Sequence, residues 1–168
     1  TATCGSRRSH WNLHRPALPA MREGWDFAEP HLIEVEVNAA DIDGLDHTNN
    51  AVYVGWCEQV AWSHSDSLGL DLAAYRDLDR AMVITRSEFD YLQASRLGDR
   101  MQVATWIVDW DGRLTMERRF QVRRVDSGET VLRARMDFAC VALSSGRPRR
   151  LPQAFIDGYG AAIRNAPS

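Results

Sequence analysis

The sequence predicts an α+β domain in which an antiparallel sheet packs against one long helix. Three features support this: an alternating strand pattern, a helical pattern after it, and four further strand patterns separated by turn signals. A helix with one apolar stripe needs an apolar surface to cover it, and a sheet curved around the helix provides that surface. With 168 residues, the chain is long enough to bury the core of one such domain.

The first strand is predicted at residues 31–37. Ile33 and Val35 alternate there with glutamates, a pattern that is typical of a strand with one buried face. The preceding residues are rich in Pro, Ser and Arg and show no periodicity. We therefore expect an N-terminal tail over residues 1–28 and a single domain over residues 29–168.

The long helix is predicted at residues 50–65, where apolar side chains recur at spacings of three and four residues. Asn49 or Asn50 is placed to cap its N-terminus. Gly69 lies shortly after its end, as a stop signal would. The residues that recur on this stripe are Tyr53, Trp56, Cys57, Val60 and His64, and we expect His64 to have a structural role.

Four strands and a last helix are predicted after a short helix near residues 72–78. Asp111-Gly112 is a strong hairpin signal between the second and third of these strands. An open sheet exposes two edges, and pairing with the edge of a second copy removes one of them. We therefore expect a homodimer, or a tetramer formed from two dimers. The strands cover residues 81–92, 100–110, 114–125 and 130–143, and the last helix covers residues 152–163.

Composition and charge exclude several classes of function. The net charge of −3 disfavours nucleic-acid binding. No run approaches the roughly 18 apolar residues that a membrane span needs. The three cysteines are far apart and have neither zinc-site nor disulfide-framework spacing. We expect no metal site and a reducing, cytoplasmic compartment.

The most informative segment is residues 41–56, DIDGLDHTNNAVYVGW, at the junction of the first strand and the long helix. Polar groups are costly to bury, so a function explains their concentration at such a junction better than packing does. The segment is not a calcium loop, because Val52 occupies the position that needs a bidentate glutamate. The chain also lacks the Gly-x-Ser-x-Gly elbow of serine hydrolases.

This motif, Asp-x-Asp-x-x-x-His-x-Asn-Asn-x-x-Tyr-x-Gly-Trp, resembles that of the hotdog-fold thioesterases. It is similar to plant-type acyl carrier protein thioesterases and to the 4-hydroxybenzoyl-CoA thioesterase group, and the resemblance covers roughly residues 30–160. It implies a hotdog fold, in which an antiparallel sheet wraps around a long central helix. It also implies hydrolysis of an acyl-CoA or acyl carrier protein thioester, without a metal or redox cofactor, to a carboxylic acid and a free thiol.

The resemblance assigns candidate catalytic residues position by position. Asp43 matches the aspartate that acts on the thioester, and His47 matches the histidine of the acyl carrier protein thioesterases. Asn50 falls where some bacterial acyl-CoA members carry a histidine. Leu45 stands where the plant-type enzymes have a catalytic asparagine, so the full plant-type set is not present. Glu58 is a secondary candidate, because some hotdog thioesterases use a helix glutamate as base or nucleophile.

The chemistry that these residues support is attack on a thioester carbonyl. Asp43 can serve as general base or as nucleophile. Backbone N–H groups at the start of the helix, over residues 49–52, can polarise the carbonyl together with the helix dipole. His47 can orient water or stabilise the leaving thiolate, or it is simply a hydrogen-bonded polar residue.

Other residues near the junction have a structural and a functional interpretation. Asp41 is expected to cap a turn, and Asn49 and Asn50 to cap the helix while fixing the oxyanion donors. Asn49 and Ala51 are candidate substrate contacts. Tyr53 and Trp56 are candidates as well, although core or interface packing suits them better.

An arginine-rich loop precedes the last helix. Arg147, Arg149 and Arg150 are candidates for binding the phosphates of coenzyme A, since guanidinium groups match phosphate oxygens; a solvated surface loop is the alternative. The arginines of the predicted strands are expected to contact solvent or a second subunit. They are Arg118, Arg119, Arg123, Arg124, Arg133 and Arg135.

The hydrolase hypothesis has two rivals. One is a hotdog dehydratase acting on hydroxyacyl thioesters, which needs a histidine–carboxylate pairing on the helix that the sequence does not clearly supply. The other is a non-catalytic acyl-thioester sensor or binding protein. A sensor of this kind usually needs a second domain, such as a DNA-binding helix pair.

Overall fold

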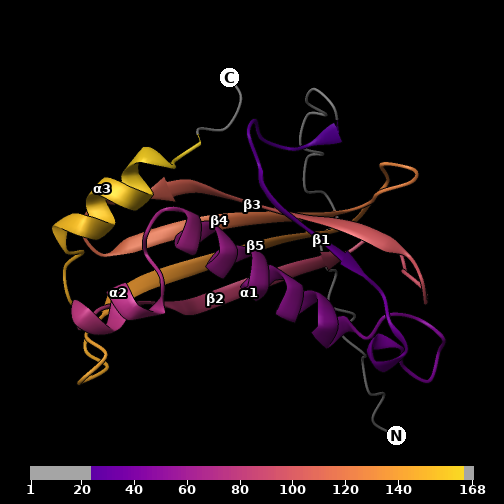
Figure 1. Cartoon of the computed structure of the whole chain (residues 1–168), viewed down its shortest axis with the longest axis horizontal. Helices are drawn as coiled ribbons and strands as arrows, with labels where there is room; N and C mark the ends of the chain where they lie inside the picture. Colours follow the sequence, from indigo (N-terminus) through magenta and orange to yellow (C-terminus); the bar gives the residue numbers. More distant parts are fainter. Residues whose placement is uncertain (1–23, 165–168) are drawn as a thin grey trace, which may run out of the picture.

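The computed structural model describes residues 24–164 and consists of one sheet, one long helix and two shorter helices (Figure 1). The predicted α+β architecture and all the predicted elements are confirmed. The strands are β1 (His31–Glu36), β2 (Ala81–Tyr91), β3 (Arg100–Trp110), β4 (Thr115–Arg124) and β5 (Thr130–Val141). The helices are α1 (Asn50–Ser67), α2 (Leu72–Asp77) and α3 (Gln153–Ala161), and a 3-10 turn, η2, spans Ala39–Asp41.

The five strands form one antiparallel sheet in the order β1-β3-β4-β5-β2. The chain therefore leaves one edge of the sheet after β1, crosses its face as α1, and returns as β2 at the opposite edge. Both of the first two strands are edge strands as a result. The edge strand β2 carries a bulge between Ile84 and Arg86, a common feature of sheet edges.

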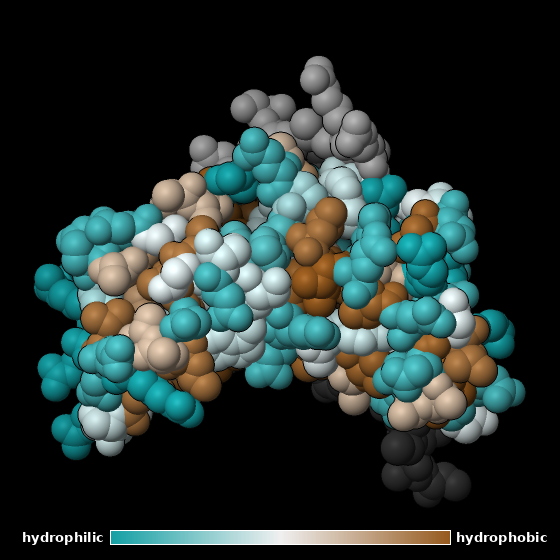
Figure 2. All heavy atoms as spheres, viewed as in Figure 1, coloured by the Kyte–Doolittle hydropathy of each residue, from teal (hydrophilic) through white to brown (hydrophobic). Residues whose placement is uncertain are grey.

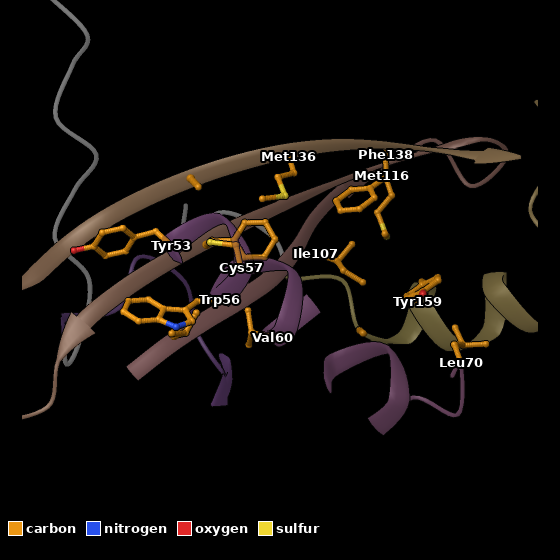
Figure 3. Packing of buried hydrophobic residues seen from close by; sticks show 14 of the residues in the cluster. Tyr53, Trp56, Cys57, Val60, Leu70, Ile107, Met116, Met136, Phe138 and Tyr159 are labelled. Atoms are coloured by element: carbon orange, nitrogen blue, oxygen red, sulfur yellow. The ribbon is translucent and has the colours of Figure 1, made fainter. Parts of the chain in front are cut away.

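The core lies between α1 and the face of the sheet that it crosses (Figure 3). Cys57 and Val60 of α1 are fully buried, which confirms the predicted apolar stripe. Met116 of β4 and Met136 and Phe138 of β5 line the sheet above α1 (Figure 3). The alternation of apolar residues along each strand places this surface on one face, so the sheet and the helix bury each other.

Residues just before β1 contact the sheet. The rings of Trp25 and Trp106 meet edge to face with centroids 6.0 Å apart, and Trp106 Nε1 donates to the carbonyl of Ala28. Asp26 forms an ion pair with Arg133. The end of the segment expected as a tail thus packs on the sheet, whereas residues 1–23 lie outside the described part of the chain.

The remaining surface is mixed in polarity. Figure 2 shows polar and apolar residues interspersed, and the molecule is hollowed along its lower edge, where β2 lies.

No helix within residues 24–164 is long and apolar enough to cross a membrane. The free thiols Cys57 and Cys140 are buried, and burial raises the pKa of Cys57 to about 12, so this thiol is a poor nucleophile.

Removal of two methyl groups from the buried side of α1 is expected to destabilise the protein. Val60 is fully buried and Val54, on the same helix, is 38% exposed. Val60→Ala should lower the free energy of unfolding by about 2 kcal/mol, from lost burial and the cavity left behind. Val54→Ala should change it by less than about 0.5 kcal/mol. Urea denaturation measures both, and equal effects would contradict the assigned core.

Candidate active site

The loop between β1 and α1 is shaped by its own aspartates and asparagines. Asn38 and Asp41 form a capping box around η2: the Asn38 N–H donates to Asp41 Oδ2 at 3.0 Å, and the Ala40 N–H donates to Asn38 Oδ1 at 3.0 Å. Asp41 therefore has the structural role predicted for it. Its backbone carbonyl also accepts from the Asn49 N–H at 2.8 Å, which ties the start of the loop to the start of α1.

Asp43 lies in a tight turn that forms hydrogen bonds with only one of its two carboxylate oxygens. Its Oδ1 accepts from the Leu45 N–H at 2.8 Å, and its backbone N–H donates to the His47 carbonyl at 2.8 Å. Asp43 Oδ2 has no hydrogen-bond partner among the described residues. The turn thus fixes the carboxylate through one oxygen and leaves the other for a ligand.

A buried hydroxyl cluster anchors this loop to the segment after β2. Thr48 Oγ1 and Tyr53 Oη each lie 2.6 Å from Ser95 Oγ, and the Thr48 N–H donates to the Ser95 carbonyl at 2.8 Å. Thr48, Tyr53 and Ser95 are all buried. Because buried hydroxyls are costly without partners, this cluster holds the loop, the first turns of α1 and the 92–95 segment together.

These contacts enclose a pocket of about 260 Å³ at the N-terminus of α1. Asp43, His47 and Asn50, three of the four predicted catalytic residues, line it together. Tyr91 closes one side and its hydroxyl donates to the Asn50 carbonyl at 3.3 Å. The other lining residues are Leu45, Thr48, Tyr53, Leu92, Gln93 and Ala94.

One backbone N–H at the start of α1 remains available to a ligand. The Asn49 N–H donates to the Asp41 carbonyl, the Ala51 N–H to Asn49 Oδ1, and the Val52 N–H to the Asn49 carbonyl. Asn49 is therefore the helix cap, as predicted. The Asn50 N–H has no partner within residues 24–164, and it lies at the positive end of the helix dipole.

Other predicted site residues lie elsewhere in this single chain. Ala51 and Trp56 do not line the pocket, and the Trp56 ring packs against Tyr53 in the core. Glu58 is exposed on α1 and lines a different pocket, between α1 and the sheet. The exposed loop with Arg147, Arg149 and Arg150 follows β5, at the opposite end of the sheet from the loop between β1 and α1 (Figure 1).

A second polar cluster, around Arg118, was not predicted. The expectation that Arg118 contacts solvent or a subunit is wrong, because its side chain is buried under α1 with only 2% of its surface exposed. It hydrogen-bonds to His64 Nδ1 at 3.0 Å and to Ser65 Oγ at 3.3 Å. Arg118 lies two residues after Met116 and two before Phe120, so the alternation of side chains along a strand places it on the same apolar face. This spacing was the signal in the sequence that Arg118 faces the core.

The Arg118 cluster extends to a second histidine. The rings of His31 and His64 stack with centroids 4.8 Å apart, and His31 Nε2 hydrogen-bonds with Ser63 Oγ at 2.9 Å. Burial, together with the charge of Arg118, lowers the pKa of His64 to about 3. His64 is therefore neutral near pH 7, and its Nδ1 can accept a hydrogen bond from Arg118.

The family model of the thioesterase-like superfamily matches residues 37–158. The chain belongs to this superfamily. The match contains the polar loop, α1 and the whole sheet apart from β1. Among curated relatives, this chain is 31% identical over 96 residues to Protein THEM6 of Danio rerio. That match covers 56% of this chain and 47% of the relative, so the chain spans about half of the relative's length.

Solved structures confirm the hotdog fold. A 1,4-dihydroxy-2-naphthoyl-CoA thioesterase from Synechocystis superposes with a TM-score of 0.71 at 21% identity, covering 79% of this chain and 96% of that one. A Staphylococcus aureus protein solved in complex with CoA superposes with a TM-score of 0.76 at 20% identity, covering 83% of this chain and 87% of that one. The 12:0-ACP thioesterase of Umbellularia californica superposes with a TM-score of 0.70 at 17% identity, covering 80% of this chain and 54% of that one.

The hydroxyl cluster should be required for stability of the loop. Ser95→Ala leaves the hydroxyls of Thr48 and Tyr53 without their shared partner, so the free energy of unfolding should fall by about 1–3 kcal/mol. Ser87→Ala, at an exposed serine of β2, should change it by less than about 0.5 kcal/mol. Chemical denaturation followed by circular dichroism measures the difference. A Ser95→Ala protein as stable as wild type would contradict the cluster.

The buried His64 should make stability depend on pH. Its pKa is lowered from 6.5 to about 3 on folding, so the unfolded state binds the extra proton. The stability that neutral His64 contributes to the folded state is fully present above pH 6.5. It is lost as the pH falls from 6.5 towards about 3, and the free energy of unfolding then decreases by at most about 1.4 kcal/mol per pH unit. His64→Asn keeps an acceptor for Arg118 and should flatten the slope between pH 6.5 and pH 4.5. An unchanged slope in denaturation series would refute the assignment.

Proposed function

We propose that the protein hydrolyses acyl thioesters, with acyl-CoA as the substrate class and Asp43 as the catalytic carboxylate. The observation that carries the proposal is that one pocket is lined by half-buried Asp43 and by Asn50 at the N-terminus of α1. Within residues 24–164, Asp43 Oδ2 and the Asn50 N–H have no hydrogen-bond partner. A carbonyl placed between Asp43 and Asn50 would have an attacking group on one side and an oxyanion donor on the other.

Two mechanisms use this arrangement. As a general base, Asp43 takes a proton from water, the water oxygen attacks the carbonyl carbon, and collapse of the oxyanion expels the thiolate, which takes up a proton. As a nucleophile, Asp43 attacks the carbonyl carbon itself, expels the thiolate, and water then hydrolyses the mixed anhydride. In both, the Asn50 N–H stabilises the oxyanion, and His47 lies in the pocket to orient water or the leaving sulfur.

Acyl-CoA is favoured over an acyl carrier protein by the arginine-rich loop, provided that the protein is a homodimer. The β2 edge is largely exposed, and two-fold pairing of two β2 strands would align the start of one with the end of the other. The loop with Arg147, Arg149 and Arg150 of one copy would then approach the Asp43 end of its partner. A structural neighbour solved with CoA supports the same ligand class.

The same pairing would also bring Glu58 toward the second copy. Within one chain, Asn50 and Glu58 are separated by about 12 Å along α1, too far to act on one carbonyl. We retain Glu58 as the second carboxylate to test, in a site that two copies complete.

Thiol release from a panel of acyl-CoAs tests the proposal. Asp43→Asn should reduce kcat by about 100-fold or more, because general-base or nucleophilic attack is lost. Asp46→Asn is the matched control: Asp46 is exposed in the same loop at φ 58°, a conformation that asparagine tolerates. It should retain most of the wild-type rate.

Each alternative outcome has a defined meaning. Equal rates for wild type and Asp43→Asn would remove Asp43 from the chemistry and make Glu58→Gln the next variant. Hydrolysis of acyl carrier protein thioesters alone would contradict the substrate class. Binding of acyl-CoA without any turnover would overturn the hydrolase in favour of a binding protein.

A further inference from the structure

The pocket between α1 and β2 is apolar along its walls and has a cation at its buried end. It has a volume of about 260 Å³, below the roughly 300–1,000 Å³ of pockets for drug-sized ligands, so it suits an acyl group rather than a whole CoA. Its outer part is formed by exposed Glu58, Val83 and Ile84. The walls are Trp62, Met82, Met116, Met136 and Phe138, and the inner end is Ser65, Tyr75, Arg118 and Tyr159.

Arg118 lacks a counter-charge at this inner end. No carboxylate of the described residues lies within ion-pair distance of its guanidinium. The groups that Arg118 contacts are neutral: the His64 ring, which is uncharged near pH 7, the Ser65 hydroxyl, and Tyr159, whose side chain hydrogen-bonds with Arg118 and whose ring centroid lies 5.7 Å from Arg118 Cζ. Burial lowers the pKa of Arg118, but a guanidinium remains charged in proteins.

The neighbouring tyrosines do not supply the missing negative charge. Tyr75 Oη and Tyr159 Oη are 2.5 Å apart, and Tyr159 Oη also lies 2.9 Å from Ser65 Oγ. Burial raises the pKa of Tyr75, which keeps its hydroxyl protonated. A buried charge without a partner is unfavourable, so the pocket lacks the anion that would complement it.

We propose that this pocket binds an acyl chain that carries a carboxylate at its far end, with Arg118 as the counter-ion. The inference rests on the proposed function and names its substrate class: thioesters of dicarboxylic acids, linked to CoA through one carboxyl group. The guanidinium matches a carboxylate in a bidentate geometry, and the apolar walls cover the methylene chain between the two ends.

The position of the pocket fits this role in a dimer. Within one chain it lies toward the C-terminal half of α1, and Ser65 is about 22 Å along the helix from Asn50. Met82 and Tyr91 mark opposite ends of β2, beside the Arg118 pocket and the Asp43 pocket respectively. Two-fold pairing of β2 strands would place the Arg118 pocket of one copy next to the Asp43 pocket of its partner.

Ligand binding without catalysis is the first test. Monomethyl esters of adipic, suberic and sebacic acid carry one neutral ester and one carboxylate, and the methyl alkanoates of equal length carry no charge. In calorimetric titrations of the full chain, at least one half-ester should bind about tenfold more tightly than its uncharged match. Equal affinities, or no binding of any half-ester, would overturn the proposal.

Variants separate ligand binding from a structural role of Arg118. Arg118→Met should lose the preference for the half-ester while remaining folded, because an apolar residue replaces a buried charge. Arg119→Met is the matched control: the adjacent arginine points to the other face of β4 and pairs with Glu117, so the preference should persist. A preference retained in Arg118→Met would overturn the proposal, and if that variant does not fold, the wild-type titrations decide.

Hydrolysis then distinguishes failure of this inference from failure of the proposed function. Wild type should cleave suberyl-CoA with a kcat/KM about tenfold above that for octanoyl-CoA, and Arg118→Met should reverse this order. Equal cleavage of both would leave the thioesterase standing and refute the carboxylate site. Tight half-ester binding that depends on Arg118, without hydrolysis of any thioester, would support the site and refute the enzyme.

Discussion

The packing of the α1 stripe onto the sheet is the contact on which the rest of the structure depends. It sets the depth at which α1 crosses the strands, and so it fixes both ends of the helix. At the N-terminus it places Asn50 in the same pocket as Asp43. Further along, it covers Arg118 and shapes the second pocket. Both pockets therefore depend on the packing of one helix against one sheet.

Polar contacts then refine what the apolar packing positions. The hydroxyl cluster joins Thr48 and Tyr53, which are five residues apart, to Ser95, which is more than forty residues further along the chain, and all three residues are buried. The Asp43 turn is formed by local hydrogen bonds within the same loop. In the proposed function, a frame that holds the Asp43 carboxylate, with one oxygen unbonded within residues 24–164, provides the pre-organisation that transition-state stabilisation requires.

The sequence predicted what depends on local periodicity and missed what depends on distant partners. Alternation and helical spacing located every strand and α1, and the loop motif brought Asp43, His47 and Asn50 together. Ser95 is a lone serine whose partners are more than forty residues away, so nothing near it in the sequence marks it. Arg118 was misassigned because its charge was given more weight than its in-step position on an apolar face. The proposed role of Glu58 depends on how a second copy of the chain packs against this one, and a single sequence does not define that arrangement.

A crystal structure of the Asp43→Asn protein with a slowly hydrolysed acyl-CoA would test the central claim most directly. The proposed function predicts that the thioester oxygen accepts from the Asn50 N–H, at a hydrogen-bond distance of about 3 Å. It also predicts that the side chain of residue 43 lies against the carbonyl carbon, in a dimer paired through β2. A thioester bound at Glu58, away from the N-terminus of α1, would contradict it.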